Sequence, residues 1–318
     1  MQSLLPLIQS PLNYTGGKFR LLPQIIPLFP QKICRFVDVF CGGCNVGINV
    51  ESDEVFFIDN DEHLIYLLQT FQHLDKSEIL NWIYDTIARY GLSLVSRYGY
   101  QHYGCDSSAG LGDFNREPFN RLRADFNHST IFDYRYYVTL YVLIVYSFNN
   151  QIRFNAAGEF NLPVGKRDFN SKMQDKLVNF IDRIQSQNCQ FRCLDFRKLD
   201  ISSLTDRDFI YADPPYLITR ATYNENGGWT DNDEYDLLKF LDNAHAAGLR
   251  FALSNVLSSK GATNHILADW LALNVNSYRA IHLAHDYSNS NYHKIDKVSA
   301  ADEILVVNYR PENGGIFS

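Results

Sequence analysis

Short apolar segments alternate along this chain with longer segments whose apolar residues recur at helical spacing. The short segments are rich in Val, Ile and aromatic residues and predict buried strands at residues 35–41, 54–59, 189–194, 208–212, 250–254 and 303–308. Helical spacing is found at residues 18–28, 63–71, 172–187, 233–247 and 263–273. Strands that alternate with helices are typical of a mostly parallel sheet with helices on both faces. The pattern therefore predicts an α/β fold.

Residues 76–167 interrupt this alternation. Tyr, Asn, Arg and Phe interleave there, and the glycine-rich stretch 98–114 predicts a loop. A strongly apolar, aromatic helix is predicted over residues 134–148, where the rings indicate packing rather than base stacking. We therefore expect two domains: residues 1–75 and 168–318 form one, and residues 76–167 form an inserted, mainly helical second domain.

Several predicted strands end at or near an aspartate. Ligands of open α/β sheets bind beyond the carboxyl ends of the parallel strands, so these side chains should converge on one site. They are Asp38, Asp59, Asp195 and Asp213. The alternative for Asp59 and Asp195 is that each caps the helix that follows it.

The segment Asp213-Pro214-Pro215-Tyr216, directly after the predicted strand 208–212, is the most informative motif. Proline fixes φ and lacks an N–H, so the turn should be stiff and its carbonyl groups available as acceptors. A carboxylate, a carbonyl group and an aromatic ring on a rigid turn suit a planar amine that is stacked and hydrogen-bonded. A simple turn that ends the strand is the alternative.

A glycine-rich turn, Cys41-Gly-Gly-Cys-Asn-Val-Gly47, follows the first predicted strand. Glycines let the backbone approach a ligand closely, and an acid such as Asp59 at the end of the next strand can hold ribose hydroxyls. The turn does not match G-x-G-x-x-G, the fingerprint of sites that bind a pyrophosphate. The pattern therefore favours a nucleoside ligand and disfavours a dehydrogenase.

Charge is unevenly distributed. The 318 residues carry a net charge of −7, which is unfavourable for binding nucleic acid. Residues 116–198, however, hold 13 Lys and Arg against 8 Asp and Glu, a local net charge of +5 that leaves −12 for the rest. A basic surface on an acidic body is compatible with DNA binding.

Composition also bears on location and metal binding. Residues 1–11 are apolar but short and lack a basic start, so we expect no signal peptide, no membrane span and a cytoplasmic protein. The cysteine pairs Cys41 and Cys44, and Cys189 and Cys193, lie far apart in the sequence and border predicted strands. We therefore expect buried, reduced thiols and no metal site.

Motifs in a fixed order resemble one family. They are Asn13-Tyr-Thr-Gly-Gly-Lys18, Phe36-Val-Asp-Val-Phe-Cys-Gly-Gly43, the run from Asn149 to Gly165, and Asp213-Pro-Pro-Tyr216. Together they are similar to the Dam-type (D12 class, alpha group) DNA N6-adenine methyltransferases, which use S-adenosylmethionine. The likeness covers the chain from about Asn13 to Tyr309. It implies a Rossmann-like methyltransferase sheet of seven strands, the last antiparallel, with a DNA-recognition module that contains a β-hairpin inserted after the second strand.

The same resemblance implies the contacts of the cofactor S-adenosylmethionine. Tyr14 and Lys18 would lie near its adenine and methionine ends, and Asp59 would hold its ribose. The remaining implied contacts are Asp38, Phe40, Cys41, Gly42 and Gly43 in the glycine turn, Asp195 and Phe196 at the cofactor adenine, and Asp213. For Lys18 the alternative is a solvated lysine of a glycine turn.

The resemblance also implies the catalytic residues, which are Asp213, Pro214, Pro215 and Tyr216. The lone pair of the adenine amine is delocalised into the ring, which makes the nitrogen a poor nucleophile. If the Asp213 carboxylate and the Pro214 carbonyl accept both amine protons, the nitrogen can become pyramidal and attack the sulfonium methyl group. Tyr216 would stack on the base, which must be flipped out of the duplex.

DNA recognition is expected in a hairpin with arms at residues 151–155 and 159–163 and a turn at residues 156–158. A two-stranded ribbon fits the major groove, where arginine reads guanine O6 and N7. In the family, the arginine that matches Arg153 reads guanine of the sequence GATC.

Other residues of this region are also expected to contact DNA: Asn149, Gln151, Asn155, Pro163, Lys166 and Arg167. Of these, Asn149, Gln151 and Pro163 match base-side or intercalating positions of the family. The chain departs from the family at Gln151, where an apolar residue is common, and at Asn13, where some members have lysine. A different adenine-containing site is therefore the alternative to GATC.

Three other activities stay open: methylation of an amine in RNA or protein, a silent DNA-binding homologue, and a dehydrogenase. Asp213 at the head of the motif, where a protein-amide methylase would have Asn, together with the hairpin, favours adenine in DNA. The expected partners are double-stranded DNA and a restriction endonuclease of the same system, and the expected state is a monomer or a transient dimer. Residues 219–228 and 286–297 are predicted to be mobile loops at the entrance to the site.

Overall fold

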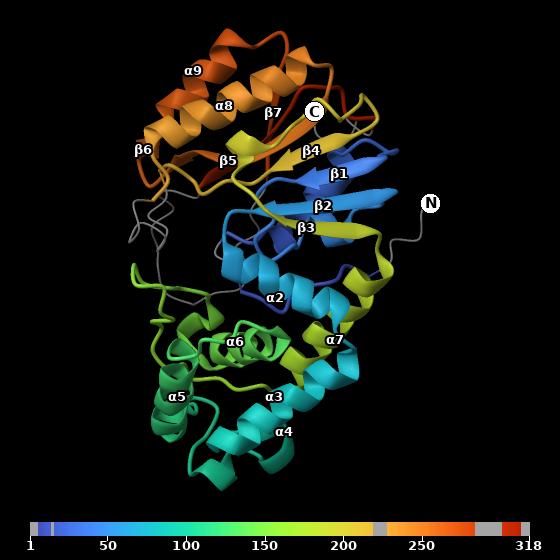
Figure 1. Ribbon diagram of the computed structural model, residues 1–318. Coiled ribbons are helices and arrows are strands. Elements are labelled where there is room, and N and C mark those ends of the chain that lie inside the picture. The colour runs from blue at the N-terminus through green and yellow to red at the C-terminus, as the bar shows by residue number, and fades with distance from the viewer. Residues whose placement is uncertain (1–5, 14–15, 219–227, 284–300, 313–318) are drawn as a thin grey trace. The chain divides into compact units, whose positions relative to one another are not determined.

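The computed structural model describes residues 6–13, 16–218, 228–283 and 301–312 (Figure 1). By its internal contacts the chain divides into two compact units. The first unit comprises residues 1–17, 42–49 and 61–193, and the second comprises residues 18–41, 50–60 and 194–318. The predicted loops at 219–228 and 286–297 lie almost entirely outside the described residues.

The second unit is built on a sheet. Its strands, in chain order, are β1 (Arg35–Asp38), β2 (Glu54–Asp59), β4 (Phe209–Ala212), β5 (Arg250–Ser259), β6 (Ala262–Thr263), β7 (Arg279–His282) and β8 (Asp302–Val307). Within this unit they run in the spatial order β2-β1-β4-β5-β8-β7, with β6 paired to β5. Strands β1, β2, β4 and β5 are parallel, whereas β8 is antiparallel to both of its neighbours. The predicted mostly parallel α/β fold with an antiparallel last strand is therefore confirmed.

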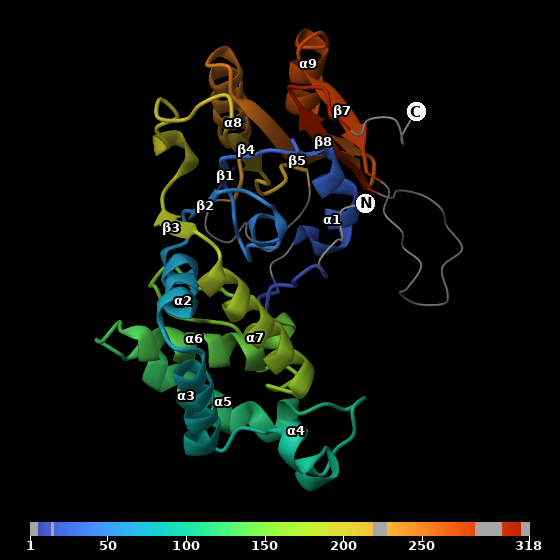
Figure 2. The same ribbon diagram turned by 90° about the vertical axis from the view of Figure 1, so that its right-hand side faces the viewer.

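Both faces of this sheet are covered, as predicted. Alternation along the strands sends Ile210 to one face, where it joins a core with residues of α8 (Asp231–Ala246) and α9 (His265–Leu273). Phe209 and Tyr211 point to the other face, where the ring of Phe29 lies 5.0 and 5.6 Å from theirs. Figure 2 shows α8 and α1 (Leu22–Ile25) on opposite sides of these strands.

Three details of this unit differ from the prediction. The segment 18–28 is not one helix but a 3₁₀ turn, the single turn α1 and a second 3₁₀ turn, because Pro23 and Pro27 remove backbone donors. Strand β5 continues beyond the predicted end at Ser254 to Ser259. Strand β7 was not predicted because its sequence, Arg-Ala-Ile-His, is short and half polar.

The first unit is mainly helical. Its longer helices are α2 (Glu62–His73), α3 (Lys76–Tyr90), α5 (Gly112–Asn127), α6 (Tyr134–Tyr146) and α7 (Ser171–Ser186). The same unit holds the short helices η3 (Gly47–Asn49), α4 (Val95–Tyr98), η4 (Gln101–Tyr103) and η5 (Phe148–Asn150) and the strand β3 (Cys189–Cys193). Helix α6 packs against α2, α3 and α5, and all of its residues from 136 to 146 except Thr139 are buried. Helix α6 is therefore the core of this unit, as predicted.

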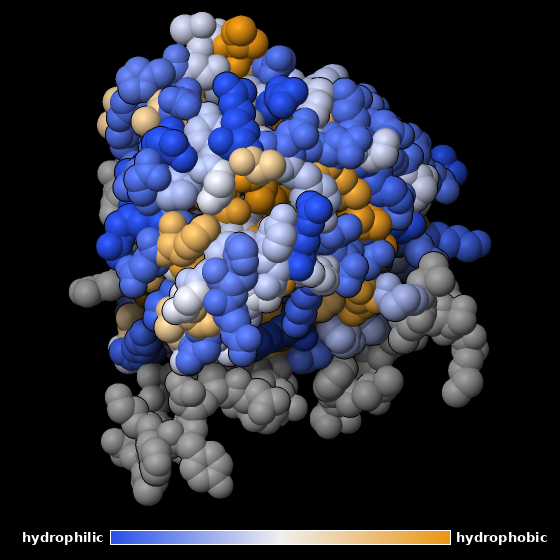
Figure 3. Space-filling view, turned by 90° about the horizontal axis from the view of Figure 1, so that it is seen from below, coloured by the Kyte–Doolittle hydropathy of each residue, from blue (hydrophilic) through white to orange (hydrophobic). Residues whose placement is uncertain are grey.

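Figure 3 shows one face of the molecule, on which hydrophilic residues predominate and apolar residues form several patches among them. Among the described residues, no helix has both the length and the apolarity that are needed to cross a membrane.

Candidate functional site

Strand β4 delivers Asp213 to the carboxyl edge of the second unit's sheet. All four residues of β4 are buried, and β4 pairs with β1 so that Tyr211 lies opposite Asp38. The next backbone N–H of β1, that of Val39, donates to the Tyr211 carbonyl at 2.9 Å. The two strands therefore end side by side, with Asp38 and Asp213 near the same edge.

The Asp213 carboxylate belongs to a cluster of four polar side chains that lie far apart in the sequence. The ammonium group of Lys18 is 2.8 Å from Asp213 Oδ1 and 3.3 Å from Glu303 Oε1. The Tyr216 hydroxyl lies within hydrogen-bonding distance of the same two oxygens, at 3.0 and 3.1 Å, and can donate its single hydrogen to either. We call Lys18, Asp213, Tyr216 and Glu303 the carboxylate–lysine cluster.

Burial makes the electrostatics of this cluster strong. Lys18 is only 3% exposed, so the alternative of a solvated lysine is wrong. Burial raises the pKa of Asp213, and the negative charge of Glu303 raises it further, while Lys18 and the Tyr216 hydroxyl act in the opposite direction. Burial and the two carboxylates also hold the pKa of Tyr216 well above its usual value. Carboxylates that are buried beside a like charge are typical of functional sites.

Glu303 was not among the predicted site residues. It lies near the start of β8, and because β8 is antiparallel to β5, the start of β8 lies at the edge where the parallel strands end. The acidic residues that precede the apolar run 304–307 were the available signal, but it could be used only after the direction of β8 was known.

Three aromatic side chains gather near the ends of the strands. The ring of Phe40 lies 5.3 Å from that of Phe196 and 5.6 Å from that of Trp229, and the last two rings are 6.0 Å apart. The Trp229 indole N–H donates to buried Glu234 at 2.6 Å. The predicted residues Phe40 and Phe196 are thus brought together, and Trp229 was missed because an isolated tryptophan after a polar loop carries no pattern.

The predicted carboxylates have different surroundings. Asp38 is 1% exposed, and Asp59 ends β2, where its carbonyl accepts the N–H of Leu194 at 2.9 Å. Helix α2 is capped by Asp61 and not by Asp59, so the capping alternative is wrong for Asp59. It is right for Asp195, whose side chain accepts the N–H of Arg197 at the start of a short 3₁₀ turn.

The glycine turn begins in the second unit with Cys41, whose N–H donates to the Ile58 carbonyl at 2.9 Å. Gly42 and Gly43 belong to the first unit. Gly42 has a φ of +46°, and a Cβ atom on Gly43 would lie 3.1 Å from the Ser10 hydroxyl, so both positions favour glycine. Tyr14 lies outside the described residues.

The predicted hairpin is present as two paired arms rather than as regular strands. Isolated antiparallel bridges join Ser147 to Val164 and Phe154 to Phe160. Across the arms, the Asn161 N–H donates to the Arg153 carbonyl at 3.2 Å, and Arg153 Nε donates to Asn161 Oδ1 at 2.8 Å.

The hairpin is anchored within the first unit by a ring contact. The imidazole of His63 on α2 stacks on Phe154, with ring centroids 3.7 Å apart and planes at 11°. Gln151, Arg153 and Asn155 are half-buried. Other predicted DNA-contacting residues of this region are exposed: Asn149, Pro163, Lys166 and Arg167.

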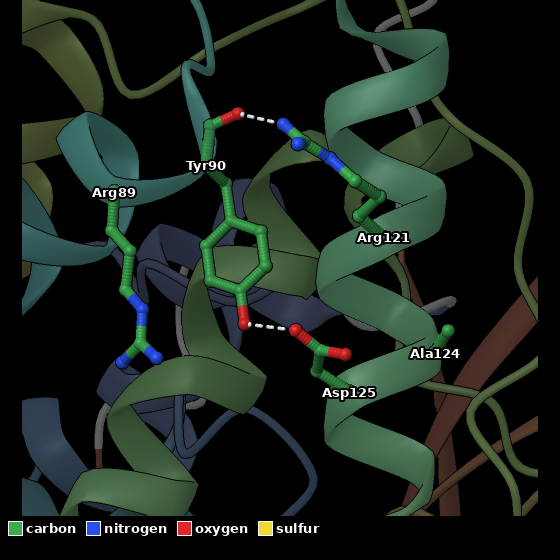
Figure 4. A pocket seen from close by; sticks show the side chains of 5 residues that line it. All are labelled: Arg89, Tyr90, Arg121, Ala124 and Asp125. Carbon is green, nitrogen blue, oxygen red and sulfur yellow. Dashed lines mark hydrogen bonds between the residues drawn. The ribbon is translucent and has the colours of Figure 1, made fainter.

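A separate shallow hollow lies on the first unit between α3 and α5 (Figure 4). It is lined by Arg89, Tyr90, Arg121, Ala124 and Asp125. Arg121 donates to the Tyr90 carbonyl at 2.8 Å, and the Tyr90 hydroxyl donates to Asp125 at 2.7 Å. None of these side chains was a predicted site residue.

The cysteines do not gather into a metal site in the part of the chain that the structure describes, where no group of three or more His, Cys, Asp or Glu could hold an ion. Cys41, Cys44 and Cys189 are buried, as expected, but Cys193 is exposed because it ends β3.

Comparison with known proteins identifies the family. The model of the D12 class N6 adenine-specific DNA methyltransferase family matches residues 14–281. The chain belongs to this family. The match includes the glycine turn, the hairpin and the Asp213–Tyr216 motif, on which the predicted resemblance rests.

Individual relatives agree with this assignment. The chain is 39% identical over 308 residues to the type II methyltransferase M.FokI of Planomicrobium okeanokoites and 38% identical over 311 residues to the modification methylase StsI of Streptococcus sanguinis. Each alignment covers 95% of this chain but only 43% of the relative. A DNA adenine methylase of Haemophilus influenzae is 28% identical over 217 residues, which cover 68% of this chain and 66% of the relative.

Proposed function

We propose that this chain transfers a methyl group from S-adenosylmethionine to N6 of an adenine in a short duplex DNA site. The observation that carries the proposal is the carboxylate–lysine cluster at the end of β4, with Lys18 and Glu303 buried, in a chain of the D12 class family. Its Asp213 is followed by two prolines and Tyr216, a stiff turn that suits a stacked and hydrogen-bonded amine.

The residues present fit the cofactor. Phe40, Phe196 and Trp229 offer ring faces and edges to a nucleobase, and Asp38 and Asp59 offer acceptors for ribose hydroxyls or an ammonium group. Gly42 and Gly43 allow close approach of the backbone. When bound, S-adenosylmethionine supplies a methyl group on a sulfonium sulfur, which leaves as a neutral thioether.

The chain's own residues activate the amine. Asp213 Oδ1 already accepts from Lys18 and Tyr216, which leaves Asp213 Oδ2 to accept one amine N–H, while the Pro214 carbonyl accepts the other. Acceptance of both protons localises the nitrogen lone pair and orients it, and such positioning supplies much of the acceleration. The Tyr216 ring stacks on the base, which is flipped out of the duplex.

We assign recognition of the DNA sequence to residues 76–167, whose hairpin would lie in the major groove of the DNA. Arg153 is half-buried in the hairpin, where its Nε and one outer nitrogen donate to the Asn161 side chain and carbonyl, and arginine is the side chain best suited to read guanine in the major groove. GATC is the first candidate site, and another adenine-containing sequence is the alternative. Lys166, Arg167 and Lys172 are exposed and suit phosphate contacts.

The decisive experiment uses labelled S-adenosylmethionine. The chain is incubated with duplexes that contain GATC, with duplexes in which that site is scrambled, and with RNA, and the products are digested to nucleosides. Label in N6-methyladenosine from DNA supports the proposal, and its restriction to one duplex identifies the site. Label only in RNA or in the protein, or no label in the presence of bound cofactor, would favour an RNA or protein methylase or a silent homologue.

Arg153→Ala tests the reading role. Loss of a bidentate contact to guanine should cost about 1–3 kcal/mol of discrimination at one base pair and leave affinity for scrambled DNA unchanged. Lys166→Ala is the matched control, because loss of a phosphate contact should weaken all duplexes alike and flatten the salt dependence. If Arg153→Ala weakens every duplex equally, Arg153 is a phosphate contact.

We also propose a cellular setting. M.FokI is named a type II methyltransferase and StsI a modification methylase, and these names support a role for this chain in a restriction–modification system, beside an endonuclease that cuts the same site. The proposed location is the cytoplasm. A monomer, or a transient dimer, suffices because one strand is methylated at a time.

A further inference from the structure

Glu234, on α8 of the second unit, is a buried carboxylate that the chemistry above does not use. It is 0% exposed, and both of its oxygens accept hydrogen bonds. Oε1 accepts from the side-chain amides of Asn255 at 3.0 Å and Asn264 at 2.8 Å, and Oε2 accepts from the Trp229 indole N–H at 2.6 Å. These donors come from β5, from the N-cap of α9 and from the segment just before α8. Burial of a carboxylate is costly, so this arrangement calls for a function.

Backbone contacts fix the orientation of the two amide groups. The Asn255 side-chain oxygen accepts the Val256 N–H at 2.7 Å, and the Asn264 side-chain oxygen accepts the Leu267 N–H at 3.1 Å. Each amide therefore directs its NH2 group at Glu234. The side chain at this position must in turn offer acceptors on two sides, which a carboxylate does with its two oxygens. A neutral amide there would turn an NH2 group toward either the two asparagines or the indole.

The indole that Glu234 holds belongs to the aromatic group near the ends of the strands. The Trp229 ring lies 5.6 Å from that of Phe40, with the planes at 79°, and 6.0 Å from that of Phe196, with the planes at 38°. Trp229 is half-buried, so part of its side chain stays accessible. The hydrogen bond at the edge of the indole ties the ring to buried Glu234 and thereby selects its side-chain rotamer.

We infer that Glu234 is a positioning residue that fixes the Trp229 indole for contact with the nucleobase of the cofactor. Asn255 and Asn264 hold the carboxylate on one side, and the carboxylate holds the indole on the other. The ring is thus pre-organised, and little side-chain freedom is lost when the cofactor binds. The inference rests on the proposed function for the identity of the cofactor, but not for the identity of the methyl acceptor.

Three variants separate this role from a merely structural one. Glu234→Gln has a single acceptor oxygen, so it cannot serve the asparagines and the indole at once. Glu234→Asp keeps both oxygens but is shorter by one methylene group and cannot reach both sides, and it serves as the second variant if Glu234→Gln does not fold. Trp229→Phe keeps an aromatic ring but has no N–H, so Glu234 can no longer act on the ring through this bond.

The first readout needs no ligand. The chain has three tryptophans, so the fluorescence of Trp229 is the difference between the spectra of the unchanged chain and of Trp229→Phe. For Glu234→Gln the blank is the double variant with Trp229→Phe. In Glu234→Gln the Trp229 emission should shift to longer wavelength and be quenched more strongly by acrylamide, because the released indole turns toward water.

The second readout is the dissociation constant of S-adenosylmethionine, measured by calorimetry. Glu234→Gln should weaken binding by about three- to tenfold in the unchanged chain, but by less than about twofold in the Trp229→Phe background. With DNA, KM for S-adenosylmethionine should rise, while kcat and KM for DNA change little. A residue that only stabilises the fold would change cofactor affinity alike in both backgrounds, or in neither.

The matched control is Asp242→Asn, which weakens a second tryptophan–carboxylate bond of α8. Asp242 accepts the Trp270 indole N–H at 2.9 Å and the Tyr278 hydroxyl at 2.6 Å, and the Trp270 ring lies 4.6 Å from that of Tyr278. This variant should lower stability and leave the affinity for S-adenosylmethionine within about twofold of the unchanged chain.

Unchanged Trp229 fluorescence in a folded Glu234 variant overturns the inference. Unchanged cofactor affinity in that variant also overturns it, as does an equal loss of affinity with and without Trp229→Phe. Failure of DNA methylation together with the expected fluorescence and binding changes would refute the proposed function alone.

Discussion

Strand β4 has an aspartate at each end, one buried and one half-buried, and the two differ in what surrounds them. Asp208 precedes the strand and lies 2.7 Å from Arg35, and Asp213 follows it and lies 2.8 Å from Lys18. The ion pairs are alike in length, but the pKa of Asp208 is lowered and that of Asp213 is raised.

The difference comes from the balance between burial and the neighbouring groups. Burial raises the pKa of Asp208, but Arg35 and the N–H of Thr205 outweigh it by donating to the ionised carboxylate. At Asp213 burial raises the pKa by more than Lys18 and the Tyr216 hydroxyl lower it, and the negative charge of Glu303 adds to the rise. The start of β4 is thus arranged for stability, whereas its end holds a carboxylate at an electrostatic cost, which is typical of a reactive site.

The largest expected effect is at the end of the strand. Asp213→Ala removes the acceptor of the target amine, so single-turnover methylation should fall by about 10²–10³-fold or more. Binding of duplex DNA, measured by fluorescence anisotropy, should stay within a few fold because the phosphate contacts are assigned to the first unit. Methylation at the unchanged rate by this variant would refute the assigned mechanism.

At the start of the strand the expected effect is on folding. Asp208→Asn removes the charge that Arg35 and Thr205 share, and the free energy of unfolding at neutral pH should fall by about 1.5–3 kcal/mol. Urea denaturation measures this loss, and methylation by the folded fraction should be unaffected. Equal stability of the variant and the unchanged chain would remove the contrast between the two ends.

Acid should abolish this difference in stability. Because the folded pKa of Asp208 is lowered, its contribution is present above the unfolded value of 3.8 and is lost as the pH falls through the lower folded value. The curves of stability against pH for Asp208→Asn and the unchanged chain should therefore converge in acid.

How far the sequence predicts this site depends on whether a residue's neighbours are local. The strand 208–212 and the motif that follows are specified by adjacent residues, an apolar run and two prolines, so both were predictable. The partners of Asp213 were less so. Lys18 was found only through a resemblance, and Glu303 is brought to the site by the antiparallel direction of β8, which no local pattern encodes.

The same reasoning applies to the hairpin and to Trp229. The hairpin was predicted through its resemblance to the recognition hairpin of the family, but the stacking of Phe154 on His63, which depends on tertiary packing, was not predicted. Trp229 is held by Glu234, and this bond forms only once α8 is in place. Packing between distant segments is therefore the part that the sequence did not reveal.

The smallest predicted effect extends the comparison to a buried aspartate of the first unit. Asp168 is 1% exposed and accepts the Val95 N–H at 2.6 Å. Burial raises its pKa, and the bonds from Val95 and Ser93 only partly oppose this. A raised folded pKa means that its contribution to stability is present below 3.8 and is lost as the pH rises through the folded value.

Asp168→Asn should therefore behave in the opposite way to Asp208→Asn. The Asn side-chain oxygen can still accept from Val95 while no charge is buried, so at neutral pH the variant should be as stable as the unchanged chain or more stable, by less than about 1 kcal/mol. Urea denaturation from acid to neutral pH should show the two curves separating as the pH rises rather than converging. A loss as large as that of Asp208→Asn would mean that hydrogen bonding at Asp168, and not the direction of its pKa shift, decides the effect of removing a buried carboxylate.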